Sequence, residues 1–187
     1  MHTKLSTLFE IPVAKFNWQN HHHIFDNMSP IMHQWLYETG SLTQRAINYC
    51  RKNKSNFNVK VLKHDYGLPE QSEMKILNLQ AEQECLIREV LLNCNQTAII
   101  YARTVIPQST MIGKHEQLRL LGNKPLGEYL FSQDDMIRGP LEISSYKNST
   151  NQNHYWARRS LFYLQKNPLL VYEIFLQSMK TYDKTCY

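Results

Sequence analysis

The sequence predicts an α+β fold, in which an antiparallel β-sheet carries its helices on one side. Two observations predict it: short apolar segments with strand-like alternation recur along the chain, and the helices come in two short pairs, each followed by strands. With 187 residues, of which 42% are hydrophobic and 20% charged, the chain is long enough for one substantial core. We therefore expect a single domain over residues 1–187.

The first helical pair is predicted over residues 30–50. Ser29 provides a helix cap, and Pro30 stands at the first helical position, where its missing N–H costs nothing. This helix ends before Gly40, and Ser41 begins the next one. The short connection predicts a helical hairpin.

The second helical pair is predicted over residues 115–131. A helix that starts at His115 ends at Gly122, and Pro125 opens another helix. The strands are predicted from β-like alternation, and residues 65–83 between two of them are expected to be mostly loop. The expected strands are residues 59–64, 84–93, 97–107 and 138–147 and a terminal hairpin over 155–177.

Charged residues interrupt three of the apolar strands. Glu173 shares one strand face with Val171 and Phe175, while Arg88 and Arg103 stand on similarly apolar strands. Burial of an unpaired charge costs several kcal/mol in practice, so each of these groups needs a partner or a ligand. They either pair within the protein or reach its rim, or the arginines bind a carboxylate ligand while Glu173 meets a hydroxyl or an acidic C–H.

The formal net charge of +5 suits an acidic partner, which could be nucleic acid, a membrane surface or a small dianionic metabolite. The apolar run from Pro168 to Leu176 is too short to cross a bilayer, so no membrane span is expected. Four cysteines without CxxC spacing indicate neither a zinc site nor a disulfide framework, which favours a reducing compartment. The tract His21–His23 lacks spaced partners and is read as an exposed polar turn rather than a metal site.

Four motifs, IREVLL, ARTVIP, LGNKPLGEYLF and WARRSLFYLQKNPLLVYEIFL, occur in an order that resembles the chorismate lyase family. With GSLTQR at residues 40–45, the resemblance runs from about Trp35 to Leu176 and leaves an N-terminal extension at 1–28 and a tail at 178–187. It implies a six-stranded antiparallel sheet with two helix-turn-helix flaps over a buried ligand. The implied reaction converts chorismate to 4-hydroxybenzoate and pyruvate, as a first step towards a quinone, and needs no cofactor or metal.

The resemblance also implies the site. It makes Arg88 and Glu173 the catalytic residues, and Leu42, Arg88, Leu126 and Glu173 the substrate contacts. Arginine suits a substrate with two carboxylates, and we expect Arg88 to stabilise the negative charge that builds on the departing enolpyruvyl group. Glu173 either orients the 4-hydroxyl, the preferred role, or assists removal of the neighbouring proton. Three further arginines are read as supporting groups of the site or as solvated or strand-pairing residues: Arg103, Arg158 and Arg159.

Two other function classes are weighed against the lyase. The same fold serves as the effector-binding domain of some bacterial regulators, but residues 1–28 are too short for the DNA-binding module that precedes such domains. A direct DNA binder is less favoured, because the helical hairpins are mostly apolar and their basic residues do not line one recognition helix. We expect a monomer that binds no nucleic acid and resides in the cytoplasm or plastid stroma, with cyanobacterial and plastid-encoded relatives.

Overall fold

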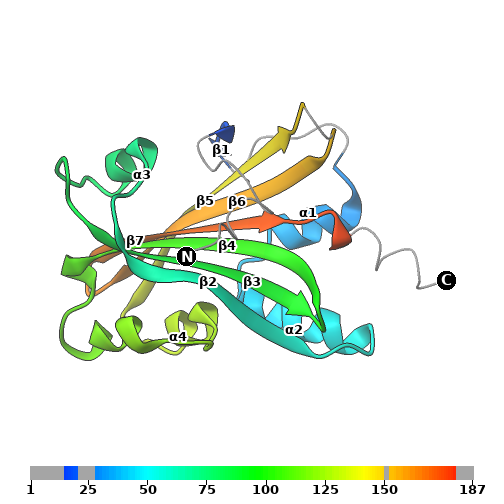
Figure 1. Cartoon of the computed structure of the whole chain (residues 1–187), viewed down its shortest axis with the longest axis horizontal. Coiled ribbons are helices and arrows are strands. Elements are labelled where there is room, and N and C mark those ends of the chain that lie inside the picture. Colours follow the sequence, from blue (N-terminus) through cyan, green and yellow to red (C-terminus); the bar gives the residue numbers. More distant parts are fainter. Residues whose placement is uncertain (1–14, 21–27, 150–151, 180–187) are drawn as a thin grey trace, which may run out of the picture.

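One antiparallel sheet of seven strands forms the centre of the molecule, and six of its strands are long (Figure 1). The computed structural model describes residues 15–20, 28–149 and 152–179. The strand order across the sheet is β1-β5-β6-β7-β4-β3-β2, and every neighbouring pair is antiparallel. The predicted α+β class is therefore confirmed. The strands are β1 (Gln19–Asn20), β2 (Phe57–Gly67), β3 (Cys85–Cys94), β4 (Thr97–Pro107), β5 (Met136–Lys147), β6 (His154–Leu164) and β7 (Asn167–Phe175).

The first helical hairpin consists of α1 (Pro30–Leu36) and α2 (Leu42–Lys52), which together form the first flap. The predicted cap is present, because the hydroxyl of Ser29 accepts from the N–H of Met32. Ser41, which was predicted to begin the second helix, caps it by accepting from the N–H of Gln44. The buried sides of both helices pack on the sheet residues Val90, Leu92 and Phe175. This flap therefore covers one face of the sheet.

The second predicted pair begins with a 3₁₀ helix, which is more tightly wound than the expected α-helix. It consists of a 3₁₀ helix (Gly113–Leu120) and α4 (Leu126–Phe131), which together form the second flap. The ring of His115 is fully buried and lies 2.8 Å from the Tyr129 hydroxyl and 3.0 Å from Asp135 Oδ2. These contacts join the two helical segments to the strand that follows them. A 3₁₀ segment is the geometry that suits such a short turn-rich connection.

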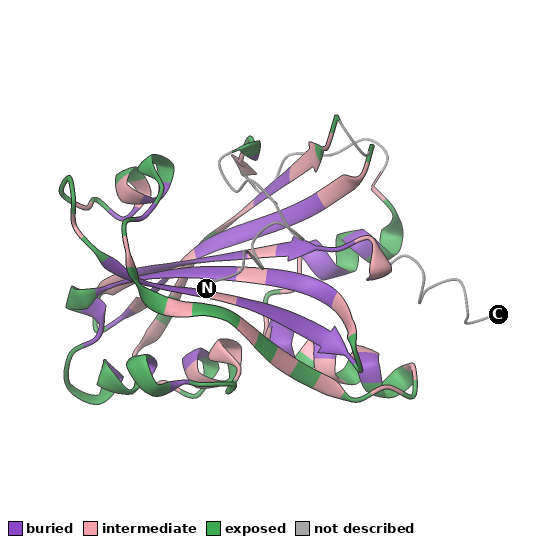
Figure 2. Cartoon of the chain, in the orientation of Figure 1, coloured by how far each residue is buried: buried purple, intermediate pink, exposed green. Residues whose placement is uncertain are grey.

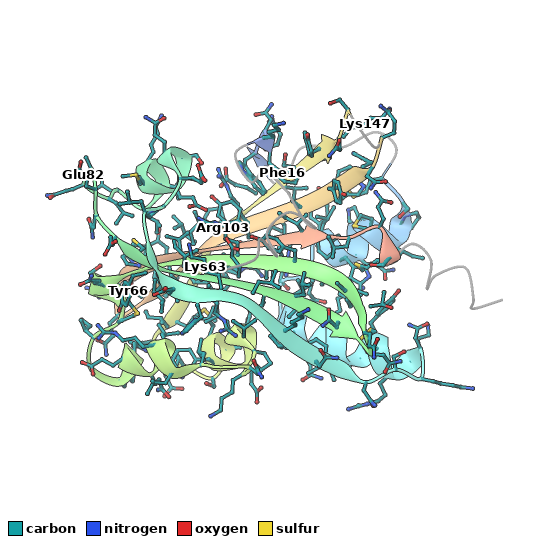
Figure 3. All side chains as sticks on the ribbon, in the orientation of Figure 1. Phe16, Lys63, Tyr66, Glu82, Arg103 and Lys147 are labelled. Atoms are coloured by element: carbon teal, nitrogen blue, oxygen red, sulfur yellow. A yellow bond between two sulfur atoms is a disulfide. The ribbon has the colours of Figure 1, made fainter. Side chains whose placement is uncertain are left out.

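The opposite face of the sheet is covered by α3 (Gln71–Ile76) and by the segment around Phe16 (Figures 1 and 3), so the expectation that the helices lie on one side is wrong for α3. Helix α3 falls within residues 65–83, which were read as mostly loop, and β2 extends to Gly67, beyond its predicted end. A capping box between Glu70 and Glu73 stabilises the start of α3. The central strands are therefore buried on both faces (Figure 2).

A disulfide joins Cys50, near the end of α2, to Cys94, at the end of β3. The expectation that the cysteines form no disulfide is wrong for this pair, and the support that unpaired cysteines gave to a reducing compartment is removed. Cys85 is free and buried. The tract His21–His23 and Cys186 lie outside the described residues.

Candidate active site

A small cavity of about 50 Å³ lies between the sheet and the two flaps. Pockets for drug-sized ligands are typically on the order of 300–1,000 Å³, so a ligand larger than a few waters needs the flaps to move. The cavity walls are mostly apolar. Its lining residues include Leu42, Thr43, Arg88, Leu126, Gly127, Arg138, Arg158, Phe162 and Glu173.

All four residues that the sequence analysis assigned to substrate binding line this cavity. Arg88 and Glu173 rise from the sheet floor, Leu42 begins α2 of the first flap, and Leu126 begins α4 of the second. These residues are up to 131 positions apart in the chain, as Leu42 and Glu173 show. The structure thus brings the candidates together, while their catalytic roles remain predictions.

The strand register explains why Arg88 and Glu173 share a face. Glu173 is paired with Ala102 on β4, and Ala102 with Val90 on β3. Side chains of paired residues point to the same face, and so do residues two apart on one strand, which places Arg88 on the face of Glu173. Two strand spacings and two residues separate their Cα atoms, so both side chains extend over the floor between them.

Arg88 is 2% exposed and contacts the second flap from beneath. Its guanidinium donates to the carbonyl oxygens of Gly122 and Lys124, both at 2.9 Å, and stands 3.4 Å from Nδ1 of His64. Within the described part of the chain it has no carboxylate partner. Desolvation lowers the pKa of Arg88 from its ordinary value, because burial disfavours a charge that nothing opposite offsets.

Glu173 is paired with Arg158, its cross-strand neighbour on β6. The Nε of Arg158 donates to the Glu173 carboxylate at 2.5 Å, and the carboxylate side chain keeps 18% of its surface exposed. The Nη1 of Arg158 donates to three carbonyl oxygens where α1 ends, those of Trp35, Leu36 and Glu38. Arg158 therefore neutralises the Glu173 carboxylate and also holds the end of the first flap's helix on the sheet.

Arg138 is a charged residue of the cavity that strand alternation did not indicate. It lies on β5, its guanidinium stacks 5.3 Å from the ring centre of Phe162, and its Nε donates to the Ser160 hydroxyl at 3.2 Å. Its Nη1 donates to the carbonyl oxygens of Thr39 at 3.0 Å and Glu38 at 3.3 Å, in the turn of the first flap. Like Arg88, it has no carboxylate partner among the described residues.

The charges of the cavity do not balance. Three arginines against one glutamate leave a formal excess of two positive charges. Desolvation is the main cause that lowers the pKa of Arg138, and the neighbouring charge of Arg158 lowers it further, while Glu173 and Glu38 raise it. Because buried cations are costly until an anion pairs with them, the cavity is suited to a small dianion.

Arg103 and Arg159 lie on the opposite face of the sheet and do not support this cavity. Arg103 donates to both carboxylate oxygens of Glu73 on α3, at 2.8 and 2.9 Å, and to Glu89 at 2.5 Å (Figure 3). Arg159 pairs with Glu142 and stacks over the ring of Trp18, 4.5 Å from its centre. These contacts therefore support a structural, charge-paired role for Arg103 and Arg159.

Other site classes receive no support from the described residues. No group of three or more metal-ligating side chains gathers among them. Nor does any helix of the described chain combine the length and the apolar character needed to cross a bilayer.

The model of the family described as chorismate lyase matches residues 13–187, which is nearly the whole chain. The chain belongs to the chorismate lyase family. The resemblance read from the four motifs is thereby confirmed at the family level.

Three bacterial members show how far the similarity extends. A probable chorismate pyruvate-lyase of Marinobacter nauticus is 42% identical over 142 residues, covering 76% of this chain and 74% of its own length. The chorismate pyruvate-lyase of Hamiltonella defensa is 37% identical, with 79% of each chain covered. A probable chorismate pyruvate-lyase of Vibrio vulnificus is 30% identical over 179 residues, with 96% of each covered. The expected closeness to cyanobacterial and plastid-encoded members gains no support from these bacterial relatives.

Solved structures with a similar fold include effector domains of bacterial regulators. The effector domain of PhnF from Mycobacterium smegmatis has a TM-score of 0.53 at 11% identity, covering 75% of this chain and 91% of its own. A gene product of Staphylococcus aureus has a TM-score of 0.53 at 13% identity, covering 76% and 92%. At these identities the likeness shows the fold alone.

Proposed function

We propose that this member of the chorismate lyase family converts chorismate to 4-hydroxybenzoate and pyruvate in the cavity between the sheet and the flaps. One observation carries the proposal. Arg88, Glu173, Leu42 and Leu126, which come from the sheet and from both flaps, line the same cavity. The excess of two positive charges in that cavity complements the two carboxylates of chorismate.

The chemistry requires a bond cleavage and a proton transfer within this space. The ether bond at ring carbon 3 breaks, the hydrogen at carbon 4 leaves as a proton, and the ring becomes aromatic. The departing enolpyruvate takes up a proton and becomes pyruvate, so atoms and charge balance without a redox partner. The apolar walls keep water from the reactive ring and strengthen the charged interactions inside.

Glu173 is proposed to orient the 4-hydroxyl of the substrate. Its carboxylate already accepts a hydrogen bond from Arg158, which fixes its direction on the cavity floor. An ionised carboxylate accepts from a hydroxyl without any proton being moved, so orientation needs nothing beyond the observed geometry. General-base work remains the alternative role, and a substitution separates the two.

The function is tested by incubating the purified protein with chorismate and following 4-hydroxybenzoate by chromatography and pyruvate by a coupled assay. Equal yields of both products are expected. Arg88→Ala is expected to lower kcat/KM by at least about 100-fold, because a desolvated guanidinium contact to a carboxylate is lost. Binding of chorismate without turnover by the folded wild-type protein would contradict the lyase and support an effector-binding role.

Glu173→Gln tests the role of the carboxylate, with Arg51→Gln on the exposed side of α2 as a control that touches neither flap contact nor cavity. Orientation predicts that the glutamine variant loses affinity for 4-hydroxybenzoate along with rate. General-base work predicts that affinity is kept while kcat falls. Because the variant leaves Arg158 buried without its counter-charge, thermal unfolding must be recorded beside the kinetics.

We also propose that the product enters quinone biosynthesis and that the protein acts as a monomer. The support for the second statement is that the sheet residues and both flap residues assigned to the substrate come from one chain. Sedimentation at assay concentrations measures the state directly, and activity that rises with dimer formation would contradict it. A plastid location is not proposed.

A further inference from the structure

We propose that Arg138 binds the carboxylate of the enolpyruvyl group, the part of chorismate that leaves as pyruvate. This inference rests on the proposed function and extends it, since it assigns a ligand contact to a residue outside the four predicted ones. It also moves the stabilisation of the departing group from Arg88, where the sequence analysis placed it, to the other side of the cavity.

The sheet order places Glu173 midway between Arg88 and Arg138, the two cavity arginines without a carboxylate partner in the described chain. Arg88 is on β3, Glu173 on β7 and Arg138 on β5, and in the order β5-β6-β7-β4-β3 the strand of Glu173 is the middle one. At about 4.8 Å per strand, each arginine starts roughly 10 Å from the glutamate strand. Arg138 leans inward from β5, because its Nε bonds Ser160 on β6. Across the strands the carboxylate therefore lies between the two cations. Along the strands Arg88 is level with Val171 and Arg138 with Leu169, so both start on the same side of Glu173.

Chorismate presents its polar groups in the same order. The ring carboxylate and the 4-hydroxyl lie at opposite ends of the ring, and the enolpyruvyl ether is attached beside the hydroxyl. If Arg88 holds the ring carboxylate and Glu173 the hydroxyl, the enolpyruvyl carboxylate must emerge next to Glu173 and away from Arg88. The cations on that side of the cavity are Arg138 and Arg158.

Neither Arg138 nor Arg158 uses its Nη2 for a hydrogen bond within the described chain, so charge and exposure separate them: Arg158 already pairs with Glu173, whereas Arg138 pairs with no carboxylate there. Arg158 is 1% exposed, its Nε is bound to Glu173, and its Nη1 is shared among three carbonyl oxygens. Arg138 is half-buried, has no carboxylate partner among the described residues, and uses Nε and Nη1 for its contacts there. Its Nη2 makes no hydrogen bond to the described chain and can donate to a carboxylate.

The surroundings of Arg138 fix its plane for that contact. The ring of Phe162 lies against one side of the guanidinium, and the Ser160 hydroxyl and the flap carbonyls hold its edge. A guanidinium held in this way loses little conformational entropy when a carboxylate arrives. Negative charge grows on the enolpyruvyl group as the ether breaks, so the contact strengthens towards the transition state.

A contact between Arg138 and the enolpyruvyl carboxylate should affect binding of the substrate but not binding of the product. The product 4-hydroxybenzoate keeps the ring carboxylate and the hydroxyl but lacks the enolpyruvyl group. Arg138→Gln, which retains an amide donor for the flap carbonyls but removes the charge, is expected to lower kcat/KM for chorismate by about 10- to 100-fold. Its Kd for 4-hydroxybenzoate, measured by calorimetry, is expected to stay within about threefold of wild type. Arg138→Lys should recover part of the lost rate because the charge is restored.

Two results would overturn the assignment. Equal losses for chorismate turnover and for 4-hydroxybenzoate binding would show that Arg138 acts only by holding the first flap through Thr39 and Glu38. Unchanged kinetics in a variant with normal thermal unfolding would show that it has no role in the reaction. Arg51→Gln, which makes the same substitution at an exposed position away from the cavity, serves as the control for the loss of one positive charge. An inactive wild-type protein would instead refute the proposed function, so the two failures are distinguishable.

Discussion

Replacing Gly127 with alanine is expected to hold the two flaps apart without unfolding either of them. Gly127 is on α4 of the second flap and faces α2 of the first. A Cβ at this position would lie 2.7 Å from Oγ1 of Thr43 and 3.3 Å from Oγ of Ser41. Ordinary contact begins at 3.4 Å, so the nearest pair must separate by about 0.7 Å before the flaps can close.

The expected loss of kcat/KM follows from the steric cost of the added methyl group in the closed arrangement of the flaps. Overpacking in a close contact costs typically about 1–3 kcal/mol, and here it applies only to the closed arrangement of the flaps. This corresponds to a roughly 5- to 150-fold lower population of the closed state, and kcat/KM should fall by a similar factor. Alanine also favours a helix over glycine by about 1 kcal/mol, so α4 itself should not be weakened. The thermal midpoint is therefore expected to change by no more than about 3 °C.

The assay compares wild type, Gly127→Ala, Thr43→Ala and the double variant in chorismate turnover. Thr43→Ala removes the oxygen that the new methyl group would meet, so the double variant should recover part of the activity that Gly127→Ala loses. This recovery is the decisive readout, since a general loss of stability would add rather than cancel. Wild-type kinetics in Gly127→Ala would mean that the working enzyme never brings the flaps as close as they are here.

Three further outcomes are expected elsewhere in the molecule. The Cys50–Cys94 disulfide spans 44 residues, so its reduction should lower the free energy of unfolding, measured in urea, by roughly 4 kcal/mol. The stability of Cys50→Ser should not depend on reductant. Equal stability of the wild type with and without reductant would contradict the disulfide. Glu73→Gln leaves Arg103 buried with only Glu89 as its ion partner and should destabilise the fold by about 3 kcal/mol while the folded protein keeps its kcat, since this pair is across the sheet from the cavity. Burial raises the pKa of the Cys85 thiol to about 11, so it stays protonated at pH 8, and peptide mapping after alkylation of the native protein should find it unmodified.

The site residues on the sheet could be predicted from the sequence because charged side chains are unusual on apolar strands. Arg88 and Glu173 each place a charge on an otherwise apolar strand, and alternation correctly puts Glu173 beside Val171 and Phe175. The same rule could not separate Arg103 from Arg88. Both stand on strands that are apolar on both faces, and the partner that distinguishes them, Glu73, belongs to a helix in a stretch read as loop.

Other features carried no local signal at all. Arg138 was missed because its strand is irregular: the register shifts between Arg138 and Leu141, so the alternation that exposed the other charges is lost. The disulfide joins a helix end to a strand end, a pairing that no cysteine spacing announces. The helix starts at Ser29 and Ser41, by contrast, depend only on neighbouring residues and were predicted correctly.

The cavity arginines make all their flap contacts to backbone carbonyl groups. Each of them donates to carbonyl oxygens of a flap: Arg88 to the second flap, Arg138 and Arg158 to the first. Carbonyl dipoles satisfy the N–H donors but add no negative charge, so the excess positive charge persists until a carboxylate enters. The same guanidinium groups that hold the closed flaps against the sheet are thus the ones that a substrate carboxylate completes. Closure and recognition of charge are, on this geometry, properties of one set of side chains.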